Sequence, residues 1–312
     1  MTDIAIGPPA RSVGLRGNPA RHRKENLVRG ILLTAALASV VISVLIVLSL
    51  IGGAITFLQQ ITPDHLFDDG WYPRRGEFGI PTLIVGSLLV TVIALLVAVP
   101  AGLLSAIYLA EYASPRVRRT IKPILEILAG IPSVVIGFFA LTWLSPVVVQ
   151  SLNPKSPDFN LAAAGLGVGL LTIPLIASIS EDAMRAVPRS LREASYGLGA
   201  RRAATSLRVV VPAAMSGIVA AAILGISRAL GETMVVAVAA GGSGGAQFTA
   251  NPFQQGQTIT AAMASLATGT DQVVGSAAAF QSLFFLGFLL FLLTFLLNQF
   301  GDFFVRRTRM HY

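Results

Sequence analysis

Long apolar runs divide the chain, and six of them are long enough to cross a lipid bilayer. A hydrocarbon core about 30 Å thick needs about 20 apolar residues in a helix. The runs that meet this length cover residues 29–58, 80–110, 123–150, 161–183, 214–240 and 277–304. Proline interrupts the third run at Pro132 and the fourth at Pro174. We expect kinks there, because neighbouring membrane helices re-satisfy the backbone groups that proline frees.

This pattern predicts an all-α membrane protein with six transmembrane helices within residues 29–305. The first run is longer than the apolar part of a signal peptide, and no A-x-A-like cleavage site follows it, so we expect it to remain as a helix. Residues 1–28 are basic and lack apolar periodicity, which predicts a disordered or surface-lying tail. A second, shorter basic tail is expected at 306–312.

The positions of lysine and arginine predict the orientation. With the N-terminus in the cytoplasm, 19 of the 23 basic residues fall in cytoplasmic segments and 3 fall on the opposite side. Because basic residues concentrate in cytoplasmic loops, both termini are expected to be cytoplasmic. The same asymmetry accounts for the formal charge of +8, which therefore does not indicate nucleic-acid binding.

Composition excludes several classes of function. The chain is 54% hydrophobic and 12% charged, as is typical of a membrane-embedded protein. It has no cysteine, and its three histidines lie outside the apolar runs, so neither a metal cluster nor an intramembrane nucleophile–base pair is expected. No G-x-x-x-x-G-K-[ST] segment is present, so the chain cannot bind ATP through a P-loop of its own. We expect no cofactor and no enzymatic activity in the chain itself.

The longest internal segment on the predicted cytoplasmic side covers residues 184–213. Ser190–Glu193 fits an S-x-x-E capping box. A short helix is expected over 191–198, with Gly199 as its left-handed cap, and a second short helix over 201–209. Two interpretations remain open from the residues alone: an ordinary loop in which the glutamate is only a cap, or a functional elbow lying along the membrane surface.

The same segment resembles the EAA loop of ABC importer permeases, whose pattern is E-A-A, three residues, G, nine residues and I-x-L-P. The spacing matches throughout, although Ser195, Val209 and Val211 replace Ala, Ile and Leu of that pattern. The resemblance implies a coupling helix that docks into a groove on a separate ATPase subunit. The residues that it assigns to this coupling are Glu193, Ala194, Ser195, Gly199 and Pro212.

Other segments resemble the phosphate importer permeases within that class. Residues 228–234 read R-A-L-G-E-T-M, and residues 126–135 read E-I-L-A-G-I-P-S-V-V. The W-x-P of residues 71–73 and the G-x-T-I of residues 256–259 are similar to the PstC members rather than the PstA members. The likeness runs from about residue 70 to 305 and implies a six-helix permease of the type I ABC importer architecture in a bacterial inner (cytoplasmic) membrane.

This resemblance also implies partners. They are a PstA-like second permease, two copies of a PstB-like ATPase, a PstS-like phosphate-binding protein, phosphate as the substrate, and the lipid bilayer. A permease for another oxyanion, such as molybdate or sulfate, is the alternative. An autonomous channel or carrier fits less well, because neither needs an ATPase-docking loop.

Arg228 and Glu232 place two charges inside the fifth apolar run. Arg228 follows Ala214 by 14 residues, which is about 21 Å of helix and lies near the bilayer midplane. Glu232 comes four residues later and is expected on the same helix face. The pair is either a structural ion pair or a site on the translocation path, where guanidinium receives an oxyanion. On the second interpretation the glutamate either neutralises the arginine in the empty path or accepts a hydrogen bond from a protonated phosphate oxygen.

The remaining carboxylates near the membrane surface are given simpler roles. Lys122 and Glu126 are expected to form an i,i+4 surface pair. Glu111, Glu181 and Asp182 end apolar runs on the cytoplasmic side, where capping and hydration explain them.

Overall fold

The computed structural model describes residues 19–242, 244–269 and 277–308, so residues 1–18 of the predicted tail 1–28, and residues 309–312 of the predicted tail 306–312, lie outside it. The described parts of the two tails, residues 19–28 and 306–308, are helical, so the prediction of a disordered or surface-lying tail is wrong for residues 19–28. The chain divides into two compact units, Met1–Ser49 and Leu50–Tyr312. The described part of the first unit is a single helix, the beginning of α1 (Pro19–Gln60), which starts ten residues before the predicted position. Its described side chains are almost all exposed and mostly apolar, as suits a helix in lipid.

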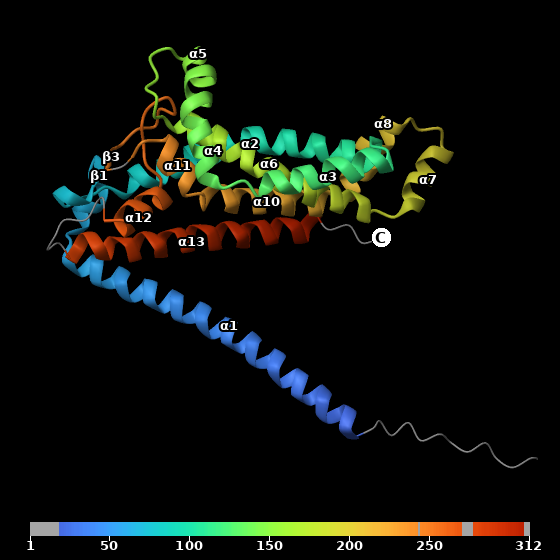
Figure 1. Ribbon diagram of the computed structural model, residues 1–312, viewed down its shortest axis with the longest axis horizontal. Helices are drawn as coiled ribbons and strands as arrows, with labels where there is room; N and C mark the ends of the chain where they lie inside the picture. The colour runs from blue at the N-terminus through green and yellow to red at the C-terminus, as the bar shows by residue number, and fades with distance from the viewer. Residues whose placement is uncertain (1–18, 243, 270–276, 309–312) are drawn as a thin grey trace, which may run out of the picture. The chain divides into compact units, whose positions relative to one another are not determined.

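The second unit is built on α2 (Ile80–Ile107) and α6 (Leu161–Ala186), which pack along their length. Small residues make this approach possible, because a Cβ on Gly165 would lie 2.7 Å from the Cβ of Ile93. The helix α10 (Met215–Leu230) packs against both, and α13 (Ala277–Thr308) packs against α10. Figure 1 shows these four helices running side by side.

The third apolar run is not one helix, so its predicted start at residue 123 is wrong. Residues 123–129 belong to α3 (Pro115–Ala129), an amphipathic helix that packs on α6 and begins at a Ser114 N-cap. After Pro132 the chain restarts as α4 (Ser133–Phe139), a π-helical segment (Ala140–Val149) and α5 (Gln150–Leu152). Pro132 therefore marks a break rather than the expected kink, whereas Pro174 lies inside the continuous α6.

The fifth run is also divided, into α10 and α11 (Met234–Ala239). Among the described residues, five helices are long and apolar enough to cross a membrane. A sixth span results if the bent pair Arg202–Ala213 and Met215–Leu230, which turns by 70°, crosses as one. The helical membrane fold agrees with the sequence-based expectation, and the number of spans lies between five and six.

The second unit carries different structures at its two ends (Figure 1). At one end an antiparallel sheet has the order β2 (Glu77–Phe78), β1 (Gly70–Tyr72), β3 (Ala246–Gln247). Two 3₁₀ turns (Pro63–Phe67 and Pro73–Arg75) and α12 (Ile259–Ala267) complete that part of the chain. The sheet is fastened by Trp71, which is fully buried and packs edge-to-face on Phe78 at 5.6 Å between ring centroids.

At the opposite end lie α7 (Arg189–Gly197) and α8 (Arg202–Thr205), as Figure 1 shows. A π-helical segment (Ser206–Val210) and α9 (Val211–Ala213) lead from them into α10. A third π-helical segment (Tyr108–Tyr112) continues α2 to the same end of the unit. The predicted helix–turn–helix elbow is therefore present, with α7 starting two residues earlier than expected.

Candidate functional site

The first candidate site is the break between α10 and α11. Arg228 lies in the last turn of α10, which ends at Leu230, and Gly231 caps it. Glu232 lies in the break, before the N-cap Thr233 of α11. The prediction that Arg228 and Glu232 share one helix face is wrong, because α10 ends at Leu230 and Glu232 lies beyond it. Gly231, a poor helix former, stands between the two residues at this end.

The guanidinium of Arg228 is exposed in the second unit. Among the side chains that the structure describes, no carboxylate forms an ion pair with it. Its neighbour in sequence, Ser227, donates to Asn298 Oδ1 of α13 at 3.0 Å. The interpretation of Arg228 and Glu232 as a mutually neutralising pair therefore has no contact to support it in the described part of the chain.

Glu232 is held by the elements that follow it rather than by Arg228. Its Oε1 accepts from the backbone N–H of Val235 at 3.4 Å, in the first turn of α11. Its backbone carbonyl accepts from Thr260 Oγ1 at 2.8 Å, which fastens the break to α12. The side chain is half-buried, and no bond to its second carboxylate oxygen is formed by the described residues.

Two sequence segments that lie about 100 residues apart meet at this site. The helix α4 packs against α11, and Gly137 lies at the contact. A Cβ on Gly137 would lie 3.1 Å from Val235 Cα and 3.2 Å from the carbonyl oxygen of Met234. The absence of a side chain thus lets the two short helices touch, and it brings the breaks at 130–132 and 231–233 into one region of the molecule.

The second candidate site is the elbow formed by α7 and α8. The N-cap of α7 is Pro188, without a side-chain cap bond, so the predicted capping box at Ser190 is wrong. Gly199 is confirmed as a left-handed cap, with φ +80°. Its N–H donates to Tyr196 O at 2.9 Å and that of Ala200 donates to Ser195 O at 3.1 Å, the paired bonds of a Schellman motif.

The residues expected to couple to an ATPase differ in their exposure. Glu193, Ala194 and Gly199 are exposed on the elbow. Ser195 is half-buried, and its Oγ lies 2.9 Å from Oγ1 of the buried Thr205, so this hydroxyl joins α7 to α8 within the elbow. Pro212 is half-buried in α9, at the far end of the segment. The elbow is a folded unit with an exposed outer surface.

Sequence reasoning assigned capping and hydration to two carboxylates at this end of the molecule and missed that both are buried. Glu181 of α6 is fully buried, and it bonds Arg118 Nε at 2.6 Å and Lys122 Nζ at 2.9 Å, both on α3. Lys122 also bonds Asp182 at 2.6 Å, so the predicted pair between Lys122 and Glu126 is wrong. Burial lowers the pKa of Lys122, but its bonds to Asp182 and Glu181 outweigh burial and raise the pKa above the ordinary value of 10.5.

The other missed carboxylate is Glu111, which is 7% exposed at the end of α2. Its Oε1 accepts from Arg192 Nη2 at 2.9 Å and from Nε at 3.1 Å. Capping and hydration do not explain it, because it is buried and bonds Arg192 of the elbow. The sequence contained a signal for this contact. Glu111 ends an apolar run on the same predicted side of the membrane as the arginine-rich segment 184–213, which could supply its partner.

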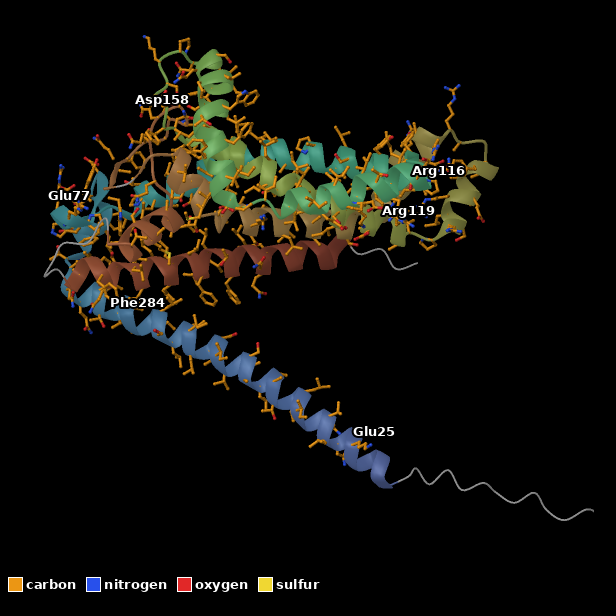
Figure 2. All side chains as sticks on the ribbon, viewed as in Figure 1. Glu25, Glu77, Arg116, Arg119, Asp158 and Phe284 are labelled. Atoms are coloured by element: carbon orange, nitrogen blue, oxygen red, sulfur yellow. The ribbon has the colours of Figure 1, made fainter. Side chains whose placement is uncertain are left out.

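Basic side chains surround the elbow. Figure 2 shows Arg116 and Arg119 at the end that carries α7, and Glu77 at the opposite end. An open cavity of about 520 Å³ lies beside α7, and four arginines and one elbow glutamate line it, namely Arg118, Arg185, Arg189, Arg192 and Glu193. Arg118 and Arg192 already bond Glu181 and Glu111. Among the described residues no group of three or more His, Asp or Glu side chains is placed to hold a metal ion.

Comparisons with known proteins agree with this architecture. Residues 98–310 match the model of the family described as "Binding-protein-dependent transport system inner membrane component". The chain is 34% identical over 247 residues to the probable ABC transporter permease protein YqgH of Bacillus subtilis (strain 168), which covers 77% of this chain and 79% of that protein. It is 31% identical to the phosphate transport system permease protein PstC of Xylella fastidiosa (strain 9a5c), over 95% of this chain and 94% of that protein.

The fold has a match among solved structures. A chain of a bacterial alginate ABC transporter, crystallised with its alginate pentasaccharide-bound periplasmic protein, superposes with a TM-score of 0.63. The match covers 91% of this chain and 97% of that chain at 18% sequence identity, so it bears on the fold alone.

Proposed function

Because the chain belongs to the family of binding-protein-dependent transport system inner-membrane components, we propose that it is the PstC-type permease of a phosphate importer. As a member of this family it is a multi-pass inner-membrane permease subunit of an ABC importer, and it is not itself an ATPase. Phosphate as the substrate is supported by the named function of its relatives. The proposed topology has six transmembrane helices of the type I arrangement, with both termini in the cytoplasm.

The observation that carries the substrate proposal is the exposed Arg228 beside the α10–α11 break, with which no described carboxylate forms an ion pair. A permanent positive charge inside a membrane span is costly unless it faces protein or water. A guanidinium with free N–H donors offers two parallel bonds to an oxyanion, and it binds phosphate better when no carboxylate competes for it. Arg228 is thus proposed to line the translocation path.

Glu232 is proposed to recognise the protonated form of phosphate. Only one of its carboxylate oxygens accepts a bond from the described residues, from Val235 N–H. The other is available to accept a hydrogen bond from the P–OH group of hydrogen phosphate, whereas sulfate is fully ionised at neutral pH and has no proton to donate. This assignment replaces the neutralising role, since no contact joins Glu232 to Arg228 in the described residues.

The elbow is proposed to be the docking element for the ATPase. Its exposed residues Glu193, Ala194 and Gly199 form the outer surface, and small side chains there permit close helix-in-groove contact. The assembly would contain a PstA-like second permease, two PstB-like ATPases and a PstS-like binding protein. Pro212 and Ser195 shape the elbow from inside rather than touching the ATPase.

The experiment is ATP-driven uptake of radiolabelled phosphate into membrane vesicles that carry this chain with its partner subunits and binding protein. Wild-type vesicles should take up phosphate, and Arg228→Gln should reduce uptake to background while the complex still assembles. Normal uptake by Arg228→Gln would overturn the path role. Competition by excess sulfate or molybdate tests the alternative substrates, and Glu232→Gln should weaken the preference for phosphate over sulfate.

A further inference from the structure

Glu111 is a buried carboxylate that the roles proposed for Arg228 and Glu232 do not use. It lies in the π-helical segment Tyr108–Tyr112, which continues α2 to the end that carries the elbow. Burying a carboxylate costs free energy unless hydrogen-bond or ion-pair partners satisfy it. Apolar residues of similar volume often stabilise a fold as well as a buried ion pair does, or better, so stability alone does not account for a charge at this position. Its partners therefore matter, and all of its side-chain bonds reach the segment that contains the elbow.

The first partner is Arg192 on α7. Its Nε and Nη2 donate to Glu111 Oε1 at 3.1 and 2.9 Å. The same guanidinium donates to the carbonyl oxygens of Val187 and Met184, each at 2.8 Å, at the end of α6. One planar group thus joins α7, α2 and α6, and charge-assisted bonds of this kind fix direction as well as distance.

The second group of partners lies on the other arm of the elbow. Arg202 of α8 donates to the backbone carbonyl of Glu111 and stacks over the Tyr112 ring, with 5.1 Å from its Cζ to the ring centroid. Ser206 Oγ lies 3.5 Å from Glu111 Oε2, and its proton is directed to the nearer carbonyl oxygen of Arg202 at 2.9 Å. Glu111 therefore holds both arms of the elbow, and the Ser195–Thr205 contact ties the arms to each other.

Two of the three π-helical segments of the described chain meet at this carboxylate, since Glu111 belongs to one and Ser206 begins the other. π-Helical turns are uncommon and are often found at functional sites. An apolar cluster built on Ala106, Met184 and Val210 lies beside them. Apolar contacts have no preferred direction, so this cluster by itself would allow the elbow to slide against α2 and α6. The hydrogen bonds to Glu111 have a fixed direction, and they therefore resist this sliding.

We propose that Glu111 is a positioning residue that locks the elbow to α2 and α6, so that a displacement of α7 by the ATPase moves these helices with it. This inference rests on the proposed function, because it assigns the transmission of force within the same permease. Without Glu111 the elbow still docks, but its movement is absorbed at the junction and ATP hydrolysis is no longer converted into transport.

The chain offers a matched control in Glu181. It too is a buried carboxylate at the same end of the molecule, held by Arg118 and Lys122. These bonds tie α3 to α6, its third pair at 3.8 Å is with Arg185 of α6 itself, and none of the three reaches α7 or α8. Glu181→Gln therefore removes a buried charge of the same kind, while it leaves every contact of Glu111 intact.

The experiment measures phosphate transported per ATP hydrolysed, in vesicles that hold the full complex and its binding protein. Glu111→Gln should co-purify with the ATPase but lower this ratio by roughly two- to thirty-fold, the range of coupling effects for residues between sites. Glu111→Asp should recover part of the ratio, and Glu181→Gln should keep the wild-type ratio even if it lowers thermal stability. Should Glu111→Gln fail to fold, Arg192→Lys serves instead, because lysine keeps the charge but cannot reach Glu111 and both carbonyls together.

A wild-type ratio in Glu111→Gln or its substitute, or an equal fall in Glu181→Gln, would overturn the inference and leave the importer assignment standing. Absence of ATP-driven phosphate uptake by the wild-type complex would instead remove the proposed function, and the inference with it.

Discussion

Arg228 differs from the arginines near the elbow in the partners that its guanidinium has. Its guanidinium is free of described partners, whereas the arginines near the elbow, Arg118 and Arg192, are committed to buried carboxylates. Residues of one type thus serve opposite purposes at the two sites. Those at the elbow hold helices together, and the one at the break is available to a ligand.

The variant Arg228→Lys tests whether phosphate uptake depends on the planar shape of the guanidinium or only on its positive charge. Lysine keeps the charge but cannot form the two parallel bonds of guanidinium. Losing one charge-assisted bond, worth about 1.5–3 kcal/mol, should lower phosphate uptake about ten- to hundredfold. The measurement is initial uptake rate at fixed amounts of assembled complex, with Arg119→Lys on the exposed face of α3 as the control. An unchanged rate in Arg228→Lys would mean that a point charge suffices.

Ser195 is a second residue-scale case. The EAA pattern has alanine there, but this hydroxyl bonds the fully buried Thr205. Ser195→Ala should lower the free energy of unfolding by about 1–3 kcal/mol, because it leaves the Thr205 hydroxyl unsatisfied. Adding Thr205→Val should recover most of the loss, as measured by thermal unfolding of the purified chain. If the double variant is as unstable as the single one, the bond is not the cause.

At the scale of elements, the elbow depends on how α7 ends. Gly199 has φ +80°, and no atom lies within 4 Å of the place where a Cβ would stand, so only backbone strain opposes a substitution.

Gly199→Ala should therefore destabilise the elbow by about 1–2 kcal/mol, the cost of left-handed backbone for an L-residue, and reduce co-purification with the ATPase. Gly197 is the matched control, since it is equally open but has no positive φ. Gly197→Ala should be neutral or stabilising by up to about 1 kcal/mol. Equal losses in both variants would show that side-chain bulk, rather than backbone strain, disturbs docking.

The elements also show which features a sequence can reveal. The left-handed cap at Gly199 was predictable because it depends on a few neighbouring residues. The division of the run 214–240 was not, because apolar content continues across the break at 231–233. The start of the third span was misplaced because the apolar face of amphipathic α3 adds to the hydrophobic count. The roles of Glu111 and Glu181 depend on partners 81 and 63 residues away, a separation that no local pattern encodes.

For the whole molecule, the main feature is the separation of the small sheet from the elbow by the length of the helices of the second unit (Figure 1). The proposed topology puts the elbow in the cytoplasm and the sheet outside. The absence of cysteine makes this orientation simple to test, since a single introduced thiol has no background.

Leu198→Cys, at a residue that is 90% exposed on the elbow, should react with a membrane-impermeant maleimide only after the cells are opened. Gln247→Cys, exposed on β3, should react in intact spheroplasts. The readout is the mass shift of the labelled chain, with the cysteine-free parent as the control. The reverse pattern would invert the topology and with it the assignment of the elbow to the ATPase.

The breaks at 130–132 and 231–233 have a consequence for the life of the subunit before assembly. A hydrocarbon environment leaves no partner for freed backbone groups, and an unpaired arginine near the same region costs at least about 2.5–3.5 kcal/mol there. In the proposed assembly with a second permease, a newly inserted chain that has not yet met its partner would expose these backbone groups and this arginine to lipid. We expect the unassembled chain to be degraded faster than the assembled one, as measured by its half-life in cells with and without the proposed partner.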